Sequence, residues 1–411
     1  MSKKTRLKFF IVDDDPDISA HMKALLESDG HAVATVESSV KAVPAIVAQK
    51  PDCVLVNLMM PERYGLELCR DLKQRRNLAK TKIIVVSGKP YESDRKQAFE
   101  VGADGYLTKP LNADAFVAEV LGILEDRIEL TFWGVRGTLP VPGRRSIRYG
   151  GSTSCVSLEF SKGEFFIFDA GTGIKNLSDR LMSEDRHKME GKIFISHPHW
   201  DHINALPFFA PLYVQGNEFE VLGASHGNVS LREMISAQMD GLYFPVRLKQ
   251  FGARVYFRNL QEEEFTLGDI AVRTKLLNHP GRCLGYRVDY KGRSICYITD
   301  NELDLEDSHF YNPFYVKRLI EFIHGCDVLI TDTTYSDEEY ASHVGWGHSC
   351  VSRVVDLAHR AQAKTLYLFH HDPDQTDDDI DAKLAAAQKL LKSRRSKTVC
   401  LAPREGDSFK I

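Results

Sequence analysis

The sequence predicts an α/β protein of two domains, a doubly wound parallel sheet followed by a sheet sandwich with helices outside. Strand and helix signals alternate over residues 1–127, which is typical of a parallel sheet with crossover helices. Residues 128–411 carry many β-type runs with helical stretches between them. The length of 411 residues agrees with two or three domains.

The composition excludes several classes of protein. No apolar run approaches the roughly 18 residues that a membrane span needs, and the run Phe9–Val12 is too short for a signal peptide. The eight cysteines contain no C-x-x-C pair, so we expect reduced thiols and a cytoplasmic location. The net charge of −4 arises beyond residue 128, which disfavours a broad nucleic-acid-binding surface on the second domain.

Short apolar runs in the first domain predict its buried strands, and they are Lys8–Val12, Cys53–Leu58, Ile83–Ser87 and Tyr106–Thr108. Helical spacing predicts helices over Ile18–Ser28 and Asn112–Asp126, the second with Asn112 as its N-cap.

Polar side chains follow these strands where each strand ends. Asp13 and Asp14 follow the first run, and Asn57, Ser87 and Lys109 stand at the ends of the later ones. Parallel sheets place their sites at the carboxyl ends of the strands. Clustered carboxylates there suit an oxygen-preferring cation, so we expect a pocket suited to Mg²⁺.

β-type runs in the second domain predict strands over Ser154–Phe160, Glu164–Asp169, Lys192–Ser196, Glu218–Leu222, Ala271–Leu277, Cys283–Tyr290, Ser294–Thr299, Val328–Thr331 and Thr365–Phe369. Helical stretches are expected over Ile174–Met182, Val229–Met239, Asn312–His324, Ser349–Ala361 and Ile380–Leu391.

The segment HPHWDH directly follows one of these strands. Alternate residues of an extended segment project to the same side, so His197 and His199 can share one ion. Asp201 and His202 follow as the chain turns and can serve a second ion. Imidazole and carboxylate ligands suit Zn²⁺, Mn²⁺ or Fe²⁺.

Further candidate ligands follow other strands. His279, Asp300 and His370 each stand just beyond a predicted strand, and His371 competes with His370 for the same role. His348 lies in the turn GWGHSC, which leads into a helix. Thirteen of the fifteen histidines lie beyond residue 128, which indicates chemistry in the second domain.

The motifs FFIVDDDPDIS, IIVVSG and GADGYLTKP resemble the receiver domain of two-component response regulators over residues 6–126. The resemblance implies a flavodoxin-like (βα)5 domain over residues 1–127. It also implies a metal-binding acidic pair at Asp13 and Asp14, a switch hydroxyl at Ser87 and the family lysine at Lys109.

The phosphoacceptor aspartate of that family corresponds to Asn57 here. An amide cannot form an aspartyl phosphate and brings no negative charge to hold Mg²⁺. We therefore expect a pseudo-receiver that acts through a signalling protein partner or a homodimer.

The signature H-x-H-x-D-H and the motifs FWGVRGTLPVPG, FIFDAGTGI and VGWGHS resemble the metallo-β-lactamase superfamily, in the branch of ribonuclease Z and cyclic-phosphate phosphodiesterases. The resemblance implies an αββα sandwich over residues 128–411 with two divalent metals. It assigns one metal to His197, His199 and His279, the other to Asp201, His202 and His370, and the bridging position to Asp300. The resemblance also implies that Asp169 supports the ligand loop and that His348 assists proton transfer.

These features favour a dinuclear metal hydrolase that cleaves a small phosphodiester, such as a cyclic nucleotide, with Asp201 and His348 in the catalytic machinery. An RNA-processing nuclease of ribonuclease Z type stays open, although the acidic second domain disfavours it. A lactonase or thioesterase is a third possibility, because the same metals activate water against a carbonyl. A non-catalytic signalling scaffold is the fourth, and the complete ligand set argues against it.

Overall fold

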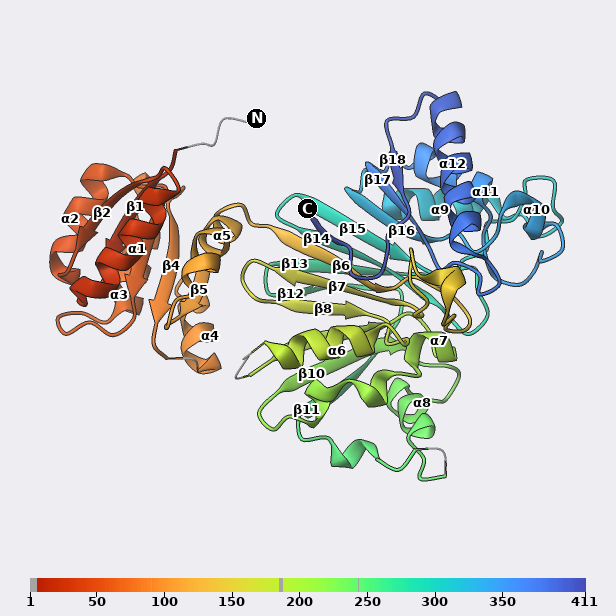
Figure 1. Cartoon of the computed structure of the whole chain (residues 1–411), viewed down its shortest axis with the longest axis horizontal. Helices are drawn as coiled ribbons and strands as arrows, with labels where there is room; N and C mark the ends of the chain where they lie inside the picture. Colours follow the sequence, from red (N-terminus) through yellow and green to blue (C-terminus); the bar gives the residue numbers. More distant parts are fainter. Residues whose placement is uncertain (1–5, 90, 185–187, 243) are drawn as a thin grey trace. The chain divides into compact units, whose positions relative to one another are not determined.

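A computed structural model describes residues 6–411 except 90, 185–187 and 243. The chain forms two compact units, one of Met1–Ile128 with Phe160–Gly163 and the other of Glu129–Glu159 with Glu164–Ile411. Figure 1 shows both units coloured along the sequence.

The first unit is a five-stranded parallel sheet of order β2-β1-β3-β4-β5. Its strands are β1 (Lys8–Val12), β2 (Ala32–Val36), β3 (Cys53–Asn57), β4 (Lys82–Ser87) and β5 (Gly105–Thr108). The connecting helices are α1 (Pro16–Ser28), α2 (Ser39–Gln49), α3 (Gly65–Gln74), α4 (Glu92–Glu100) and α5 (Ala113–Leu124). The predicted doubly wound (βα)5 sheet is confirmed.

Both faces of this sheet are buried, because neighbouring residues of each strand enter different cores. Phe9 and Ile11 belong to one core, whereas Phe10 and Val12 belong to the other. Apolar runs are therefore continuous in the inner strands, as expected for a parallel sheet. The sequence reading missed β2, an edge strand whose residues are mostly half-buried and which therefore has no continuous buried run.

The second unit contains two seven-stranded sheets. The first has the order β11-β10-β9-β8-β7-β6-β19 and the second β12-β13-β14-β15-β16-β17-β18. The first comprises β6 (Ile128–Gly134), β7 (Cys155–Phe160), β8 (Phe165–Phe168), β9 (Glu190–Ile195), β10 (Glu218–Ala224), β11 (Arg254–Leu260) and β19 (Ser408–Lys410). The second comprises β12 (Glu264–Leu267), β13 (Ile270–Leu276), β14 (Leu284–Tyr290), β15 (Arg293–Ile298), β16 (Val328–Asp332), β17 (Thr365–Phe369) and β18 (Val399–Leu401).

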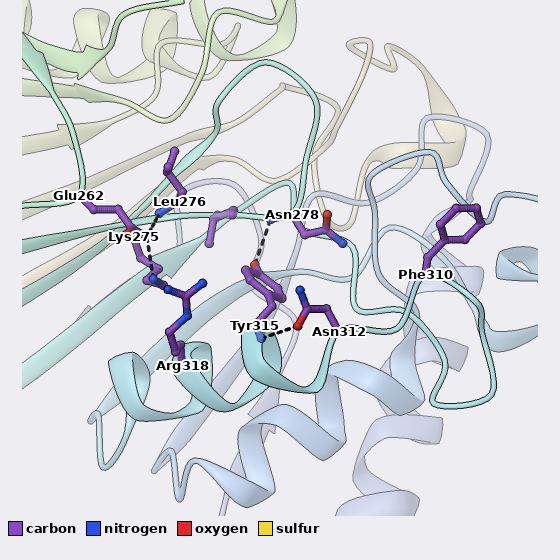
Figure 2. Close-up of a pocket in the computed structure, with 9 residues that line it drawn as sticks. Glu262, Lys275, Leu276, Asn278, Phe310, Asn312, Tyr315 and Arg318 are labelled. Atoms are coloured by element: carbon purple, nitrogen blue, oxygen red, sulfur yellow. Dashed lines mark hydrogen bonds and ion pairs between the residues drawn. The ribbon is translucent and has the colours of Figure 1, made fainter.

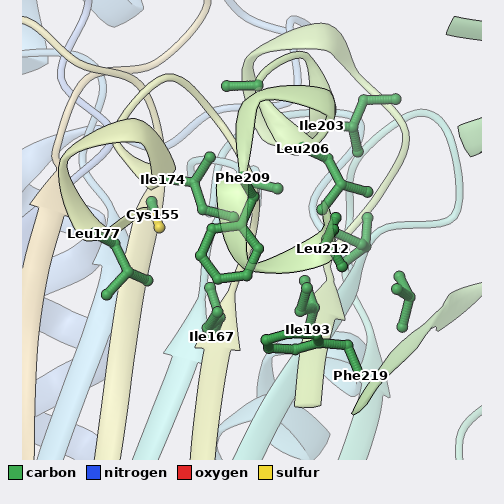
Figure 3. Close-up of a cluster of buried hydrophobic side chains, with 14 of the residues drawn as sticks. Cys155, Ile167, Ile174, Leu177, Ile193, Ile203, Leu206, Phe209, Leu212 and Phe219 are labelled. Atoms are coloured by element: carbon green, nitrogen blue, oxygen red, sulfur yellow. The ribbon is translucent and has the colours of Figure 1, made fainter. Parts of the chain in front are cut away.

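The longer helices of this unit cover the outer faces of both sheets, and short helices lie in the connections. They are α6 (Ile174–Ser183), α7 (Trp200–Ile203), α8 (Leu231–Gln238), α9 (Pro313–Ile323), α10 (Asp337–Tyr340), α11 (Val351–Arg360) and α12 (Asp377–Ser393). Ile174 and Leu177 of α6 pack on Ile167 and Ile193 of the first sheet in one apolar core (Figure 3). A second core joins α9, α11 and α12 to the other sheet.

Aromatic rings fill the space between the two sheets. The ring of Phe168 lies 5.3 Å from that of Tyr297 and 5.8 Å from that of Tyr286, measured between ring centroids. The ring of Phe194 lies 5.3 Å from that of Tyr286. Since the sheets pack face to face with helices outside, the predicted αββα sandwich is confirmed.

Candidate metal centre

The ends of several sandwich strands bring the predicted ligands together. β9 ends at Ile195, and the extended residues after it carry His197 and His199. The short helix α7 then turns Asp201 and His202 inward, where they are 7% and 0% exposed.

The ligand atoms form two groups, each with all its atoms within 4.8 Å of one another. One group is His197, His199, His279 and Asp300, and the other is Asp201, His202, Asp300 and His370. These are the seven residues to which the family resemblance assigns the two metals.

Asp300 presents one carboxylate oxygen to each group. Its Oδ2 lies 3.5 Å from His197 Nε2 and 3.7 Å from His279 Nε2. Its Oδ1 lies 3.2 Å from His202 Nε2 and 3.1 Å from His370 Nε2. A carboxylate held in this way is suited to bridge two ions.

The charges and burial of the site fit a pair of divalent cations. Burial lowers the pKa of His197 well below its usual range, and its Nε2 has no hydrogen-bond partner among the described residues. Burial alone would raise the pKa of Asp300, but the charges of His202 and His370 outweigh it and lower that pKa. The charges of Asp201, Asp300 and Asp169 outweigh burial and raise the pKa of His202 well above its usual value, so these carboxylates stabilise positive charge at this point. Imidazoles together with ionised carboxylates are the donor set that Zn²⁺, Mn²⁺ and Fe²⁺ accept, and the ion would replace the proton on His202.

Asp169 supports the ligand loop through hydrogen bonds to its residues. Its carboxylate accepts hydrogen bonds from the Ser196 N–H at 2.7 Å and the Tyr297 hydroxyl at 2.8 Å. It also lies 2.8 Å from His202 Nδ1, which directs Nε2 of that ring toward the ligand group. Such partners orient metal ligands and set their tautomers. Asp169 thus lies where the family resemblance places a supporting residue.

Backbone contacts hold the other ligands. The Thr138 N–H donates to Asp201 Oδ2 at 2.8 Å, and His279 Nδ1 lies 2.8 Å from the Gly347 carbonyl.

Asp300 and His370 have left-handed φ angles of 38° and 60°, which is costly for residues other than glycine. Strained backbone of this kind concentrates at functional sites.

His348 lies against both ligand groups. Its ring is stacked on that of His370 at 5.0 Å and lies 5.2 Å from that of His279. Its Nδ1 donates to Asp332 Oδ2 at 2.9 Å. Burial lowers the pKa of His348, but the charge and hydrogen bond of Asp332 outweigh burial and raise it to about 9.

The sequence reading missed Asp332, which is fully buried. It ends β16, beside the predicted strand Val328–Thr331, so the strand-end rule that selected Asp300 would also have found it. Asp332, His348 and His370 form a third set of convergent ligand atoms.

His371 does not take part in any of these sets within the described part of the chain. It is fully buried, and burial holds its pKa well below the usual value. Of the two competing histidines, the structure brings only His370 to the ligand groups.

The polar residues of the first unit also converge. Lys109 Nζ lies 2.8 Å from Asp13 Oδ2, and Asn57 Nδ2 donates to Asp14 Oδ1 at 2.7 Å. The Ser87 hydroxyl accepts from the Lys89 N–H at 3.1 Å. Burial raises the pKa of Asp13, although Lys109 opposes this effect. The amide of Asn57 is thus bonded directly to one carboxylate of the acidic pair.

A separate pocket of about 350 Å³ lies between the end of β13 and the start of α9 (Figure 2). Its polar groups are largely paired with one another. Lys275 Nζ lies 2.6 Å from Glu262 Oε1, and the Asn278 N–H donates to the Tyr315 hydroxyl at 3.0 Å. These pairings leave few polar groups of the pocket free to bind a ligand. The residues that line it include none of the seven candidate metal ligands.

No helix in the described ranges is long and apolar enough to cross a membrane.

Comparison with known proteins separates the two units. Residues 9–121 match the response regulator receiver domain, and residues 165–371 match the beta-lactamase superfamily domain. The phosphate regulon transcriptional regulatory protein PhoB of Pseudomonas aeruginosa is 36% identical over 114 residues, which are 28% of this chain and 50% of the relative. The chain thus spans about half the length of the curated relatives it matches.

Two solved structures are similar over the second unit. The metallo-beta-lactamase fold protein YhfI of Bacillus subtilis is 15% identical with a TM-score of 0.49, covering 70% of this chain and 100% of its own. A diphosphatase from the PhnP family is 17% identical with a TM-score of 0.49, covering 69% and 97%. Because the second match spans half of the chain and follows the first in the sequence, the chain belongs to the beta-lactamase superfamily and carries a response regulator receiver domain before its hydrolase fold.

Proposed function

We propose that the protein is a dinuclear metal phosphodiesterase that hydrolyses cyclic nucleotides or other small cyclic phosphodiesters. The observation that carries this proposal is the position of the Asp300 carboxylate. One of its oxygens faces the first histidine-rich ligand group and the other oxygen faces the second. When bound, two divalent ions supply an activated water and neutralise charge on the phosphate oxygens. His197, His199 and His279 would hold one ion and Asp201, His202 and His370 the other, with Asp300 shared.

Side chains around these groups position a ligand and supply a proton. Asp169 keeps Nε2 of His202 directed at the ligand group through its contact with Nδ1. His348 is bonded through Nδ1 to Asp332, so its protonated ring keeps a second proton on Nε2. We assign this proton to the leaving alkoxide, since such general acids contribute about 10²- to 10⁴-fold.

A substrate screen tests the proposal. The full chain, loaded with Mn²⁺ or Zn²⁺, is assayed against a 3′,5′-cyclic nucleotide, a phosphate monoester, a lactone and a structured RNA. We expect hydrolysis of the cyclic diester above the others, and none after Asp201→Ala. Asp374→Ala, which removes an exposed carboxylate elsewhere, is the matched control. Faster turnover of the lactone or the RNA would overturn the assignment in favour of that class.

The receiver domain is proposed to regulate without accepting phosphate. Support comes from Asn57, whose amide occupies the phosphoacceptor position and bonds to Asp14. Two carboxylates remain for Mg²⁺ in this pocket, at Asp13 and Asp14. The regulatory effect is then exerted through a signalling partner or a homodimer of this domain. The eight buried free thiols support placement in the reducing cytoplasm.

A further inference from the structure

We propose that Trp200 and Trp346 form an aromatic subsite that stacks the nucleobase of a nucleotide substrate. The inference rests on the proposed phosphodiesterase function and narrows its substrate class from small cyclic diesters to those that carry a base.

Both tryptophans expose most of their surface. Trp200 is 79% exposed and Trp346 62%, whereas Trp133, the third tryptophan of the chain, is 8% exposed. A single exposed aromatic side chain needs no explanation, but two exposed indoles that each adjoin a residue of the same site indicate a binding function.

Trp200 is placed by the metal-binding segment itself. It stands between His199 and Asp201, which belong to different ligand groups, and it is the first residue of α7. The turn that directs Asp201 and His202 inward leaves the Trp200 indole in solvent. Its backbone position is therefore set by the same fold that assembles the ligands.

Trp346 is held by its neighbours on both sides. The N–H groups of Gly345 and Gly347 donate to the two carboxylate oxygens of Glu302, each at 2.7 Å. The His343 ring packs edge-on against the indole at 4.7 Å. A fixed aromatic surface loses little conformational entropy when a ligand binds.

Contacts between ligand residues connect the two tryptophans. His199 Nδ1 lies 3.2 Å from His279 Nε2, and His279 Nδ1 lies 2.8 Å from the Gly347 carbonyl. Trp200 directly follows His199, and Trp346 directly precedes Gly347. Each exposed tryptophan is thus next in sequence to a residue that contacts His279 of the same ligand group.

A nucleotide matches this arrangement. Its phosphodiester would reach the ligand groups while its planar base lies against an exposed indole. Stacking of a base on an aromatic side chain contributes roughly 5- to 150-fold in affinity and accepts any base, since each has a π-face.

Tryptophan fluorescence supplies a direct binding test. Since Trp133 is buried, adenosine monophosphate added to the metal-loaded full chain should quench emission from Trp200 and Trp346. Ribose 5-phosphate, which lacks the base, should not. Trp200→Phe and Trp346→Phe should each remove part of the quench.

Kinetics supply the second arm, with adenosine 3′,5′-cyclic phosphate and its base-free methyl riboside counterpart as substrates. Trp200→Ala and Trp346→Ala should raise KM for the nucleotide roughly 5- to 150-fold, more than for the base-free diester, and Phe should restore most of the loss. Phe314→Ala removes a 77% exposed aromatic from α9 and is the matched control. Metal content is measured for every variant.

The outcomes separate the two proposals. Equal KM values of the native protein for both cyclic diesters would overturn base stacking. If neither diester is hydrolysed, the phosphodiesterase proposal fails. The quench by adenosine monophosphate then decides the subsite alone, and its absence overturns the inference.

Discussion

A methyl group added at Gly137, as in Gly137→Ala, should weaken metal binding at the ligand group that contains His370. A Cβ at this position would lie 2.1 Å from Cε1 and 2.3 Å from Nδ1 of His370. Ordinary contacts begin at 3.4 Å, so the ring must retreat by about 1.3 Å, the difference between 3.4 and 2.1 Å. Gly137 does not have a left-handed φ, so alanine is not strained in its backbone there.

That displacement exceeds what a metal ligand tolerates. Productive sites hold their side chains within about 0.5 Å, and removing a group that merely orients a ligand costs about 10- to 100-fold in metal affinity or activity. We therefore expect Gly137→Ala to lose at least this much affinity at the site of His370, while the group of His197, His199 and His279 keeps its ion.

Elemental analysis and isothermal titration with Zn²⁺ measure the effect, with His370→Ala as the reference. Gly241→Ala is the matched control, because a Cβ there meets only the flexible Arg247 side chain at 3.5 Å. Thermal melting of the metal-free proteins checks that the fold persists. Two tightly bound ions and full activity in Gly137→Ala would refute the assignment of His370 as a ligand.

Three further predictions follow from other sites. His348→Ala should slow hydrolysis of alkyl diesters by about 10²- to 10⁴-fold but nitrophenyl diesters much less, because only poor leaving groups need the proton; equal losses would exclude the acid role. Acetyl phosphate should leave the mass of the native chain unchanged and add a phosphoryl group after Asn57→Asp; phosphate on native Asp14 would contradict the pseudo-receiver. Burial lowers the pKa of Lys383 from 10.5 to about 7, so the unfolded chain binds more protons between these values and stability rises with pH. Denaturant unfolding measures the free energy of unfolding of the native protein and of Lys383→Met at each pH. The native value should increase relative to the variant by about 2 kcal/mol between about pH 7 and 9, and a constant difference would contradict the lowered pKa.

The sequence determined the architecture because burial leaves a local pattern. Apolar runs such as Cys53–Leu58 predicted strands buried on both faces, and the structure has the strand Cys53–Asn57 there, in the confirmed parallel sheet. The edge strand Ala32–Val36 was not predicted, because its half-buried residues form no continuous apolar run. The motif HPHWDH indicated metal chemistry by the same local logic, since extended backbone places alternate side chains on one side.

Tertiary structure alone decided which distant groups meet. The sequence favours His370 over His371 only because His370 directly follows the strand Thr365–Phe369. The backbone at the end of β17 turns the first toward Asp300 and buries the second among other side chains. The pairing of His348 with Asp332 likewise joins a loop to a strand end 16 residues away. Such contacts depend on how strands and loops pack around one centre, and the periodicity of a sequence records burial but not the distances between buried side chains.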